Sequence, residues 1–175
     1  FGVIYAGAQK NIGPSGATIV IIREDLLDRC SDRIPDVWNY KAHVEKQGMY
    51  NTPATYPIYI SGLVFRWLQS QGGVSQMETI NTLKAKTLYD AIDSSGGFYI
   101  NHVHPGARSK MNVIFTTGDA HLDELFAQES TTRGLQLLRG YKSMGGMRAS
   151  IYNAMPLQGV EALIEFMKEF QRRYG

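Results

Sequence analysis

The chain opens with Phe1-Gly-Val-Ile-Tyr-Ala-Gly-Ala-Gln-Lys-Asn-Ile-Gly-Pro-Ser-Gly16, a loop of mostly small residues that follows one short apolar segment and leads into another. The flanking segments, residues 1–6 and 17–22, are apolar and partly β-branched, which is typical of strands buried on both faces. Glycine and proline permit a tight path close to a ligand. Gln9, Lys10 and Asn11 stand in the middle of this path. We therefore expect an α/β fold in which this loop carries the reactive side chain.

Lys10 is the candidate catalytic residue of this loop. A lysine delivered from a buried strand into a pocket of small residues loses hydration, which lowers its pKa and leaves a nucleophilic amine suited to a Schiff base. The alternative is a solvated loop lysine, because most lysines in proteins are exposed. A P-loop is a poorer alternative, since Gln9 precedes Lys10 and Asn11 follows it, where that motif requires Gly and Ser or Thr.

The composition of the 175 residues predicts a globular protein, because 43% hydrophobic and 11% aromatic residues are ample for a packed core. A net charge of +2 from 18 basic and 16 acidic residues gives no basic stripe for nucleic acid or a membrane surface. Neither a membrane span nor a signal peptide is evident, so we expect a cytoplasmic location. No metal site is expected, because His102 and His104 lack a third ligand.

Apolar spacing beyond the loop predicts alternating helices and strands, which form a small α/β layer with helices on one side. We expect a helical turn at 23–28, loop-rich chain over 29–49, and irregular chain over 50–57. A helix begins at Ile58 and ends near Gly72. Further helices are expected over 74–93, with Met77, Ile80, Leu83, Leu88, Ala91 and Ile92 buried, over 119–134 and from 156 onward, and strands over 98–103, 111–117, 135–138 and 147–152.

Three blocks of the sequence resemble, in the same order, segments of the phosphoserine aminotransferase family. They are Tyr5–Gly16, Tyr50–Thr55 (similar to Asn-Thr-Pro-Pro-Thr) and Met144–Ala154 (similar to Gly-Gly-x-Arg-Ala-Ser-x-Tyr-Asn-Ala). These are class V pyridoxal-phosphate enzymes of the aspartate-aminotransferase fold, type I. The resemblance covers essentially the whole chain and implies the C-terminal half of such an enzyme. Residues 1–71 would end the large cofactor-binding domain, and residues 72–175 would form the small α/β domain.

The resemblance assigns two segments to the cofactor, pyridoxal 5′-phosphate. It implies that Lys10 forms the Schiff base and that Gln9 touches the phosphate end. Asn51 and Thr52 precede a proline, which holds their backbone extended, and on their own they would be ordinary turn residues. The family places the matching pair on the cofactor phosphate of the neighbouring subunit. The resemblance therefore implies a homodimer that shares its active site across a two-fold interface.

Three residues are expected to bind substrate. Arg148 follows two glycines, and its guanidinium suits a carboxylate, so the resemblance makes it the clamp on the substrate α-carboxylate; the alternative is a structural salt bridge. Tyr141 and Lys142 stand where the family commonly has His-Arg, which bind the substrate phosphate. Lys142 keeps the charge and Tyr141 keeps a hydroxyl donor, so we expect phosphate binding that is weaker or differently oriented. The alternative is a pair of exposed turn residues.

The implied activity is transfer of the amino group between L-glutamate and 3-phosphohydroxypyruvate, which gives O-phospho-L-serine and 2-oxoglutarate in serine biosynthesis. Bacterial members also serve pyridoxine biosynthesis through 4-phosphohydroxythreonine. The alternatives are another class V enzyme, such as serine-pyruvate aminotransferase or a cysteine desulfurase, for which Cys30 is badly placed, and a non-catalytic assembly module. The acidic partner of the cofactor ring and the stacking aromatic are not identifiable, so we expect the chain to need the enzyme's N-terminal half.

Overall fold

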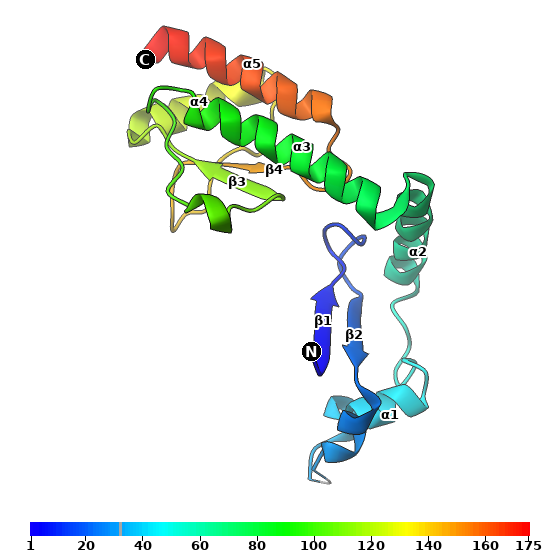
Figure 1. The fold of residues 1–175 in the computed structure, drawn as a ribbon. Coiled ribbons are helices and arrows are strands. Elements are labelled where there is room, and N and C mark those ends of the chain that lie inside the picture. The colour runs from blue at the N-terminus through cyan, green and yellow to red at the C-terminus, as the bar shows by residue number, and fades with distance from the viewer. Residues whose placement is uncertain (32) are drawn as a thin grey trace. The chain divides into compact units, whose positions relative to one another are not determined.

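Figure 1 shows the protein as a computed structural model that describes residues 1–31 and 33–175. The chain divides into two compact units, Phe1–Ser70 (unit 1) and Gln71–Gly175 (unit 2). Each unit combines helices with one pair of strands, so the chain is a mixed α/β protein. Within the described ranges, no helix combines the length and the apolar character needed to cross a membrane.

Unit 1 begins with an antiparallel hairpin of β1 (Val3–Gly7) and β2 (Thr18–Ile22), which confirms both predicted strands. The prediction that they are buried on both faces is wrong for this structure. Tyr5 is 77% exposed and Ile21 is 61% exposed. The reason is that β1 and β2 pair only with each other among the described residues, so neither is an inner strand of a larger sheet.

The segment after β2 is more helical than predicted. We expected one helical turn at 23–28, which is found, and loop-rich chain over 29–49. Asn39 caps a further helix there, because its side chain accepts a hydrogen bond from the backbone N of Lys41 at 3.0 Å. Asp32, in the same segment, lies outside the described residues. The helices of this segment are the 3-10 helices η1 (Glu24–Arg29) and η2 (Asp36–Trp38) and the α-helix α1 (Tyr40–Glu45).

The last helix of unit 1, α2 (Thr55–Ser70), begins earlier than the predicted start at Ile58. Two prolines made residues 50–57 look irregular in sequence. Pro57 nevertheless lies in the first turn of α2. A backbone N–H in that turn has no intrahelical acceptor, so a proline there costs the helix no hydrogen bond.

Unit 2 packs two long helices, α3 and α5, against each other beside an antiparallel pair of strands, β3 and β4 (Figure 1). In this pair, Ile114 lies opposite Arg148. The order matches the predicted alternation of helices and strands. The elements are α3 (Gly73–Asp93), the 3-10 helix η3 (Pro105–Ala107), β3 (Asn112–Phe115), α4 (Ala120–Thr132), β4 (Met147–Ser150) and α5 (Leu157–Tyr174).

Two predicted strands of unit 2 do not form. Over 98–103, only Ile100 pairs, with Thr116, because the Asn101 side chain donates to the Ile114 carbonyl and accepts from the backbone N of Val103. These bonds replace the ladder that a strand would form.

Over 135–138, no strand forms. Leu137 has a φ of 61°, in the left-handed region, which ends an extended run. The bridge in this region joins Arg139 to Met147 instead.

The hydrophobic core lies in unit 2. Burial alternates along β3 and β4, so one face of the strand pair is covered while the other carries half-buried residues such as Arg148. Phe126 of α4 is 0% exposed and lies at the centre. It makes edge-to-face ring contacts with four further aromatic residues, Tyr99, Phe115, Phe166 and Phe170.

Candidate functional site

The Lys10 loop of unit 1 is fixed by the backbone of Ala8. The carbonyl oxygen of Ala8 accepts hydrogen bonds from the backbone N of Lys10 at 2.6 Å and of Gly13 at 2.8 Å. Ala8 N donates to the Ala17 carbonyl at 3.0 Å, and Ala8 is fully buried. Gln9 and Lys10 follow this anchor with exposed side chains. The described residues of unit 1 therefore hold Lys10 on a rigid turn but do not supply the desolvated pocket that we expected around it.

The lysine loop packs against the first turns of α2. A Cβ atom at Gly13 would lie 2.8 Å from Oγ of Ser61 and 3.4 Å from its Cα, too close for a side chain. Ser61 is buried, and its Oγ donates to the Pro57 carbonyl at 2.8 Å. Gly13, which we expected to open the loop toward a ligand, is thus required for the contact between the loop and α2.

Asn51 and Thr52 lie in the segment that leads into α2, a few residues before the helix begins. Both are exposed. The Oγ1 atom of Thr55, the first residue of α2, donates to the carbonyl of Pro53 at 3.3 Å, which holds the junction. The beginning of α2 therefore supports both segments that the sequence assigns to the cofactor.

The structure brings two of the predicted substrate residues together in unit 2. The guanidinium carbon of Arg148 lies 4.3 Å from the centroid of the Tyr141 ring. Nε of Arg148 is buried and has no hydrogen-bond partner, and no ion pair of Arg148 occurs among the described residues. The structural salt bridge that we named as the alternative is therefore not formed within them. A guanidinium stacked on a ring keeps its edge donors free for a planar anion.

Tyr141 and Lys142 lie in a tight turn before β4. The Tyr141 carbonyl accepts from the backbone N of Gly145 at 2.8 Å, and the Lys142 side chain is exposed. Gly146 passes so close to β3 that a Cβ atom there would lie 2.6 Å from the Phe115 carbonyl oxygen. Of the two glycines that precede Arg148, Gly146 is thus required by a close approach of its backbone to β3.

His102 was considered in the sequence only as a metal ligand. In the structure it lines a small cavity of ≈ 70 Å³ together with Thr116 and Tyr141. Among the described residues, no group of three or more His, Cys, Asp or Glu side chains is arranged to hold a metal ion.

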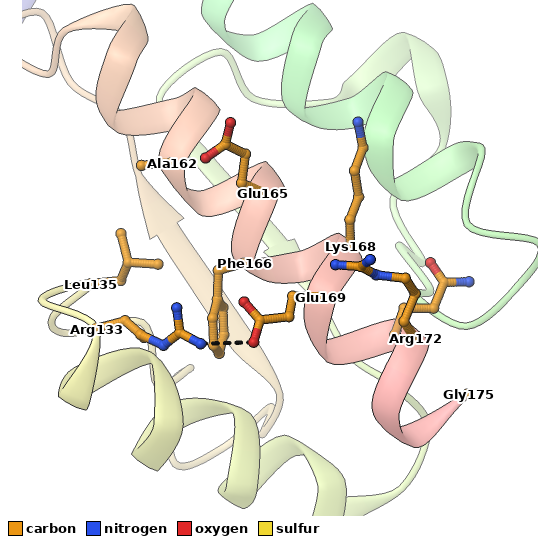
Figure 2. A pocket seen from close by; sticks show the side chains of 10 residues that line it. Arg133, Leu135, Ala162, Glu165, Phe166, Lys168, Glu169, Arg172 and Gly175 are labelled. Atoms are coloured by element: carbon orange, nitrogen blue, oxygen red, sulfur yellow. Dashed lines mark hydrogen bonds and ion pairs between the residues drawn. The ribbon is translucent and has the colours of Figure 1, made fainter.

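A larger hollow of unit 2 lies elsewhere. It is an open groove of ≈ 1030 Å³ over α5 and the end of α4. Figure 2 shows the side chains that line it. Its side chains carry both signs of charge, and Arg133 is already paired with Glu169, with Nη2 donating to Oε1 at 2.7 Å. None of the predicted site residues lines it. Lys168 and Arg172 line the groove as well and make no ion pair among the described residues, so the groove carries cations of its own, apart from the predicted site.

One buried residue of unit 2 was missed in the sequence. We placed Leu83 on the buried side of α3, but it is 51% exposed, whereas its neighbour Lys84 is 0% exposed. Helical spacing offered a signal, because Lys84 lies four residues after Ile80 and four before Leu88. Because lysine is seldom fully buried, its residue type hides that signal.

A sequence model of the class-V aminotransferase family matches residues 1–163. Curated phosphoserine aminotransferases of Neisseria meningitidis serogroup A and Chromobacterium violaceum are 67% and 58% identical over 175 residues, which is 100% of this chain and 48% of each relative. The chain thus spans about half the length of the curated relatives it matches.

Solved structures agree with the sequence matches. The phosphoserine aminotransferase from Bacillus circulans subsp. alkalophilus has a TM-score of 0.97 at 44% identity, over 100% of this chain and 48% of that one. The enzyme from Trichomonas vaginalis, described as PLP-bound, has a TM-score of 0.89 at 41% identity, over 95% of this chain and 48% of that one. These likenesses confirm the predicted fold, part of a fold-type I transferase. The chain belongs to the class-V aminotransferase family.

Proposed function

We propose that the complete protein is a phosphoserine aminotransferase, which transfers the amino group between L-glutamate and 3-phosphohydroxypyruvate. The observation that carries this proposal is the pair of Tyr141 and Arg148, whose stacked guanidinium has no ion pair within the described chain and lies beside the Lys142 turn. Such a set of donors suits a small substrate with two anionic ends. The names of the relatives at 67% and 58% identity support the same choice.

The donor set in unit 1 fits pyridoxal 5′-phosphate. Lys10 offers a primary amine, Gln9 and Asn51 offer amides, and Thr52 offers a hydroxyl, all on exposed side chains. The backbone bonds of Ala8 hold the lysine turn without using these side-chain donors. When bound, the cofactor supplies an electron sink that stabilises negative charge at the substrate α-carbon.

The residues of the chain then have separate tasks. Lys10 would hold the cofactor through Nζ, and the same amine would act as the base that moves the proton of the substrate α-carbon. Arg148 binds the α-carboxylate and orients that carbon. Lys142 and Tyr141 hold the distal anion. Because glutamate ends in a carboxylate and the keto acid in a phosphate, one cationic cluster serves both half-reactions.

The active enzyme, in this proposal, is a cytoplasmic homodimer in which Asn51 and Thr52 reach the cofactor phosphate of the neighbouring subunit. It also requires an N-terminal portion such as the relatives have. The exposed apolar side chains of unit 1, including Tyr5 and Ile21, support this requirement, because large exposed apolar patches mark interaction surfaces. A cysteine desulfurase has less support, since Cys30 is half-buried at the end of η1.

The test is borohydride reduction of the complete protein loaded with pyridoxal phosphate, followed by peptide mass mapping. We expect a phosphopyridoxyl mass on Lys10 and none on Lys46, an exposed lysine of the same unit. In kinetics, Lys10→Ala should lower kcat by about 10²-fold or more, since a positioned general base contributes that much, while Lys46→Ala should not change it. A loaded protein whose Lys10 stays unmodified would support the non-catalytic assembly module instead.

A further inference from the structure

Lys84 of α3 is fully buried and points at the chain that follows β4. Its Nζ donates three hydrogen bonds to backbone carbonyl oxygens, to Ile151 at 3.2 Å, Tyr152 at 2.8 Å and Met155 at 2.9 Å. These acceptors use all three donors of an ammonium group. One side chain of α3 therefore fixes the turn that begins directly after β4.

The same turn is held from two further directions. One helical turn before Lys84, Nδ2 of Asn81 donates to Oδ1 of Asn153 at 2.8 Å, and Asn81 is also buried. On the side of β3, Ile151 N donates to the Met111 carbonyl at 2.9 Å. Ile151 is thus bonded at its N–H by the chain before β3 and at its carbonyl by Lys84.

Arg148 lies three residues before Ile151, on β4 itself. Its backbone N donates to the Leu138 carbonyl at 2.7 Å, which fixes the other end of the strand relative to the Tyr141 turn. Because β4 is short, its two ends set the direction in which the Arg148 side chain leaves the sheet. The Lys84 bonds hold the far end.

We propose that Lys84 is a positioning residue: by holding the Ile151 and Tyr152 carbonyls it sets β4 so that Arg148 presents its guanidinium to the substrate carboxylate. This inference rests on the proposed function. The sequence comparisons and the family motifs do not assign Lys84 this role.

The burial of Lys84 has a cost in desolvation that its three hydrogen bonds offset. Burial lowers the pKa of Lys84, because removing the ammonium from water disfavours its charged form. An apolar side chain of similar length would avoid that cost, but it would leave the three carbonyl oxygens without their donor. What an apolar side chain cannot do is hold three carbonyl oxygens in one geometry.

The experiment compares Lys84→Met with Lys86→Met in the complete enzyme loaded with pyridoxal phosphate. Lys86 lies on the same helix, but its side chain is 69% exposed and pairs with Asp90. We expect Lys84→Met to raise KM for glutamate and for the keto acid about tenfold with kcat nearly unchanged, as for a weakened ground-state contact. Lys86→Met should leave both constants at the wild-type values.

A second readout does not depend on activity. Amide hydrogen exchange over residues 147–155 should be faster in Lys84→Met than in the wild type, and unchanged in Lys86→Met. Faster exchange without a change in KM would overturn the inference, since Lys84 would then be purely structural. If the wild type does not transaminate at all, the proposed function itself fails, and the exchange result still reports whether Lys84 holds β4.

Should Lys84→Met fail to fold, Asn81→Ala gives the same test at a milder level. It removes one hydrogen bond to the same turn, so we expect KM to rise about threefold. An unchanged KM in a folded Asn81→Ala enzyme would also overturn the inference.

Discussion

Unit 1 and unit 2 contain similar apolar residues but use them differently. Unit 2 closes a core of its own around Phe126, whereas unit 1 leaves Trp38 73% exposed and most of its hairpin uncovered. Both units carry residues assigned to the site. In unit 1 the buried residues Ala8 and Ser61 hold the Lys10 loop, whereas in unit 2 a packed core lies beneath the strand that carries Arg148. The difference teaches that a strongly apolar sequence predicts a strand more safely than it predicts burial, because burial depends on which other segments cover the strand.

The largest effect should come from the core of unit 2. Phe126→Ala removes a buried ring with four aromatic neighbours and should lower the free energy of unfolding of unit 2 by about 3–5 kcal/mol. In unit 1, Ile4→Ala should cost less than about 1 kcal/mol in the chain of residues 1–175, because Ile4 is half exposed there. Chemical denaturation followed by hydrogen exchange in each unit measures both. Equal losses would break the contrast between the units.

Sequence patterns were sufficient where one physical signal dominated. The apolar runs of β1 and β2 and the 3.6-residue periodicity of α3 and α5 were read correctly because local spacing determines them. The segment around Asn101 was not, since a side chain there takes the hydrogen bonds of a strand. The conformation of Leu137 was not predicted either, because leucine seldom has a positive φ and nothing in the sequence indicates one there.

For the candidate site, sequence reasoning named residues but not the contacts that support them. It named Tyr141 and Arg148 separately, and only the fold shows the ring stacked on the guanidinium. It attributed Gly13 to ligand access, although Ser61 of a helix some 50 residues later explains it. The role of Lys84 was missed because its hydrogen-bond acceptors are backbone carbonyl oxygens. Which carbonyls lie near a side chain cannot be read from a sequence.

A substitution at Gly13 in unit 1 should have an intermediate effect on stability. Gly13→Ala forces a methyl group against Ser61, in the contact that holds the lysine loop on α2, and should destabilise that contact by about 1–3 kcal/mol. The matched control is Gly62→Ala, the next residue of α2, where a Cβ atom meets nothing within 4 Å. Replacing this helical glycine should be neutral or stabilise by up to about 1 kcal/mol.

Hydrogen exchange of the loop around Lys10 measures the result. Faster exchange in Gly13→Ala and not in Gly62→Ala would show that unit 1 has one specific internal contact despite its exposed strands. If both variants behave like the wild type, the loop is held by the Ala8 backbone alone, and unit 1 is looser than its hydrogen bonds indicate.

The smallest effect concerns acid. Glu129 joins α4 to the end of α5, and hydrogen bonds from Tyr174 and then Arg173 lower the pKa of its carboxyl group. A carboxyl group with a lowered pKa in the folded state stabilises the fold at pH above its unfolded value, and that contribution is lost as the pH falls through the folded pKa. In unit 1, Arg23 lowers the pKa of Asp25, but this pair lies within one turn and joins no separate elements.

Acid should therefore loosen the end of α5 before it affects the hairpin. We expect less than about 1 kcal/mol from Glu129, because its side chain and that of Arg173 are partly exposed to screening water. Unfolding free energies measured from pH 7 down to below 4 should fall more steeply for the wild type than for Glu129→Gln, which cannot titrate. Parallel curves would mean that the α4–α5 junction depends on apolar contacts, such as the ring contact of Phe126 with Phe170, and not on the charge of Glu129.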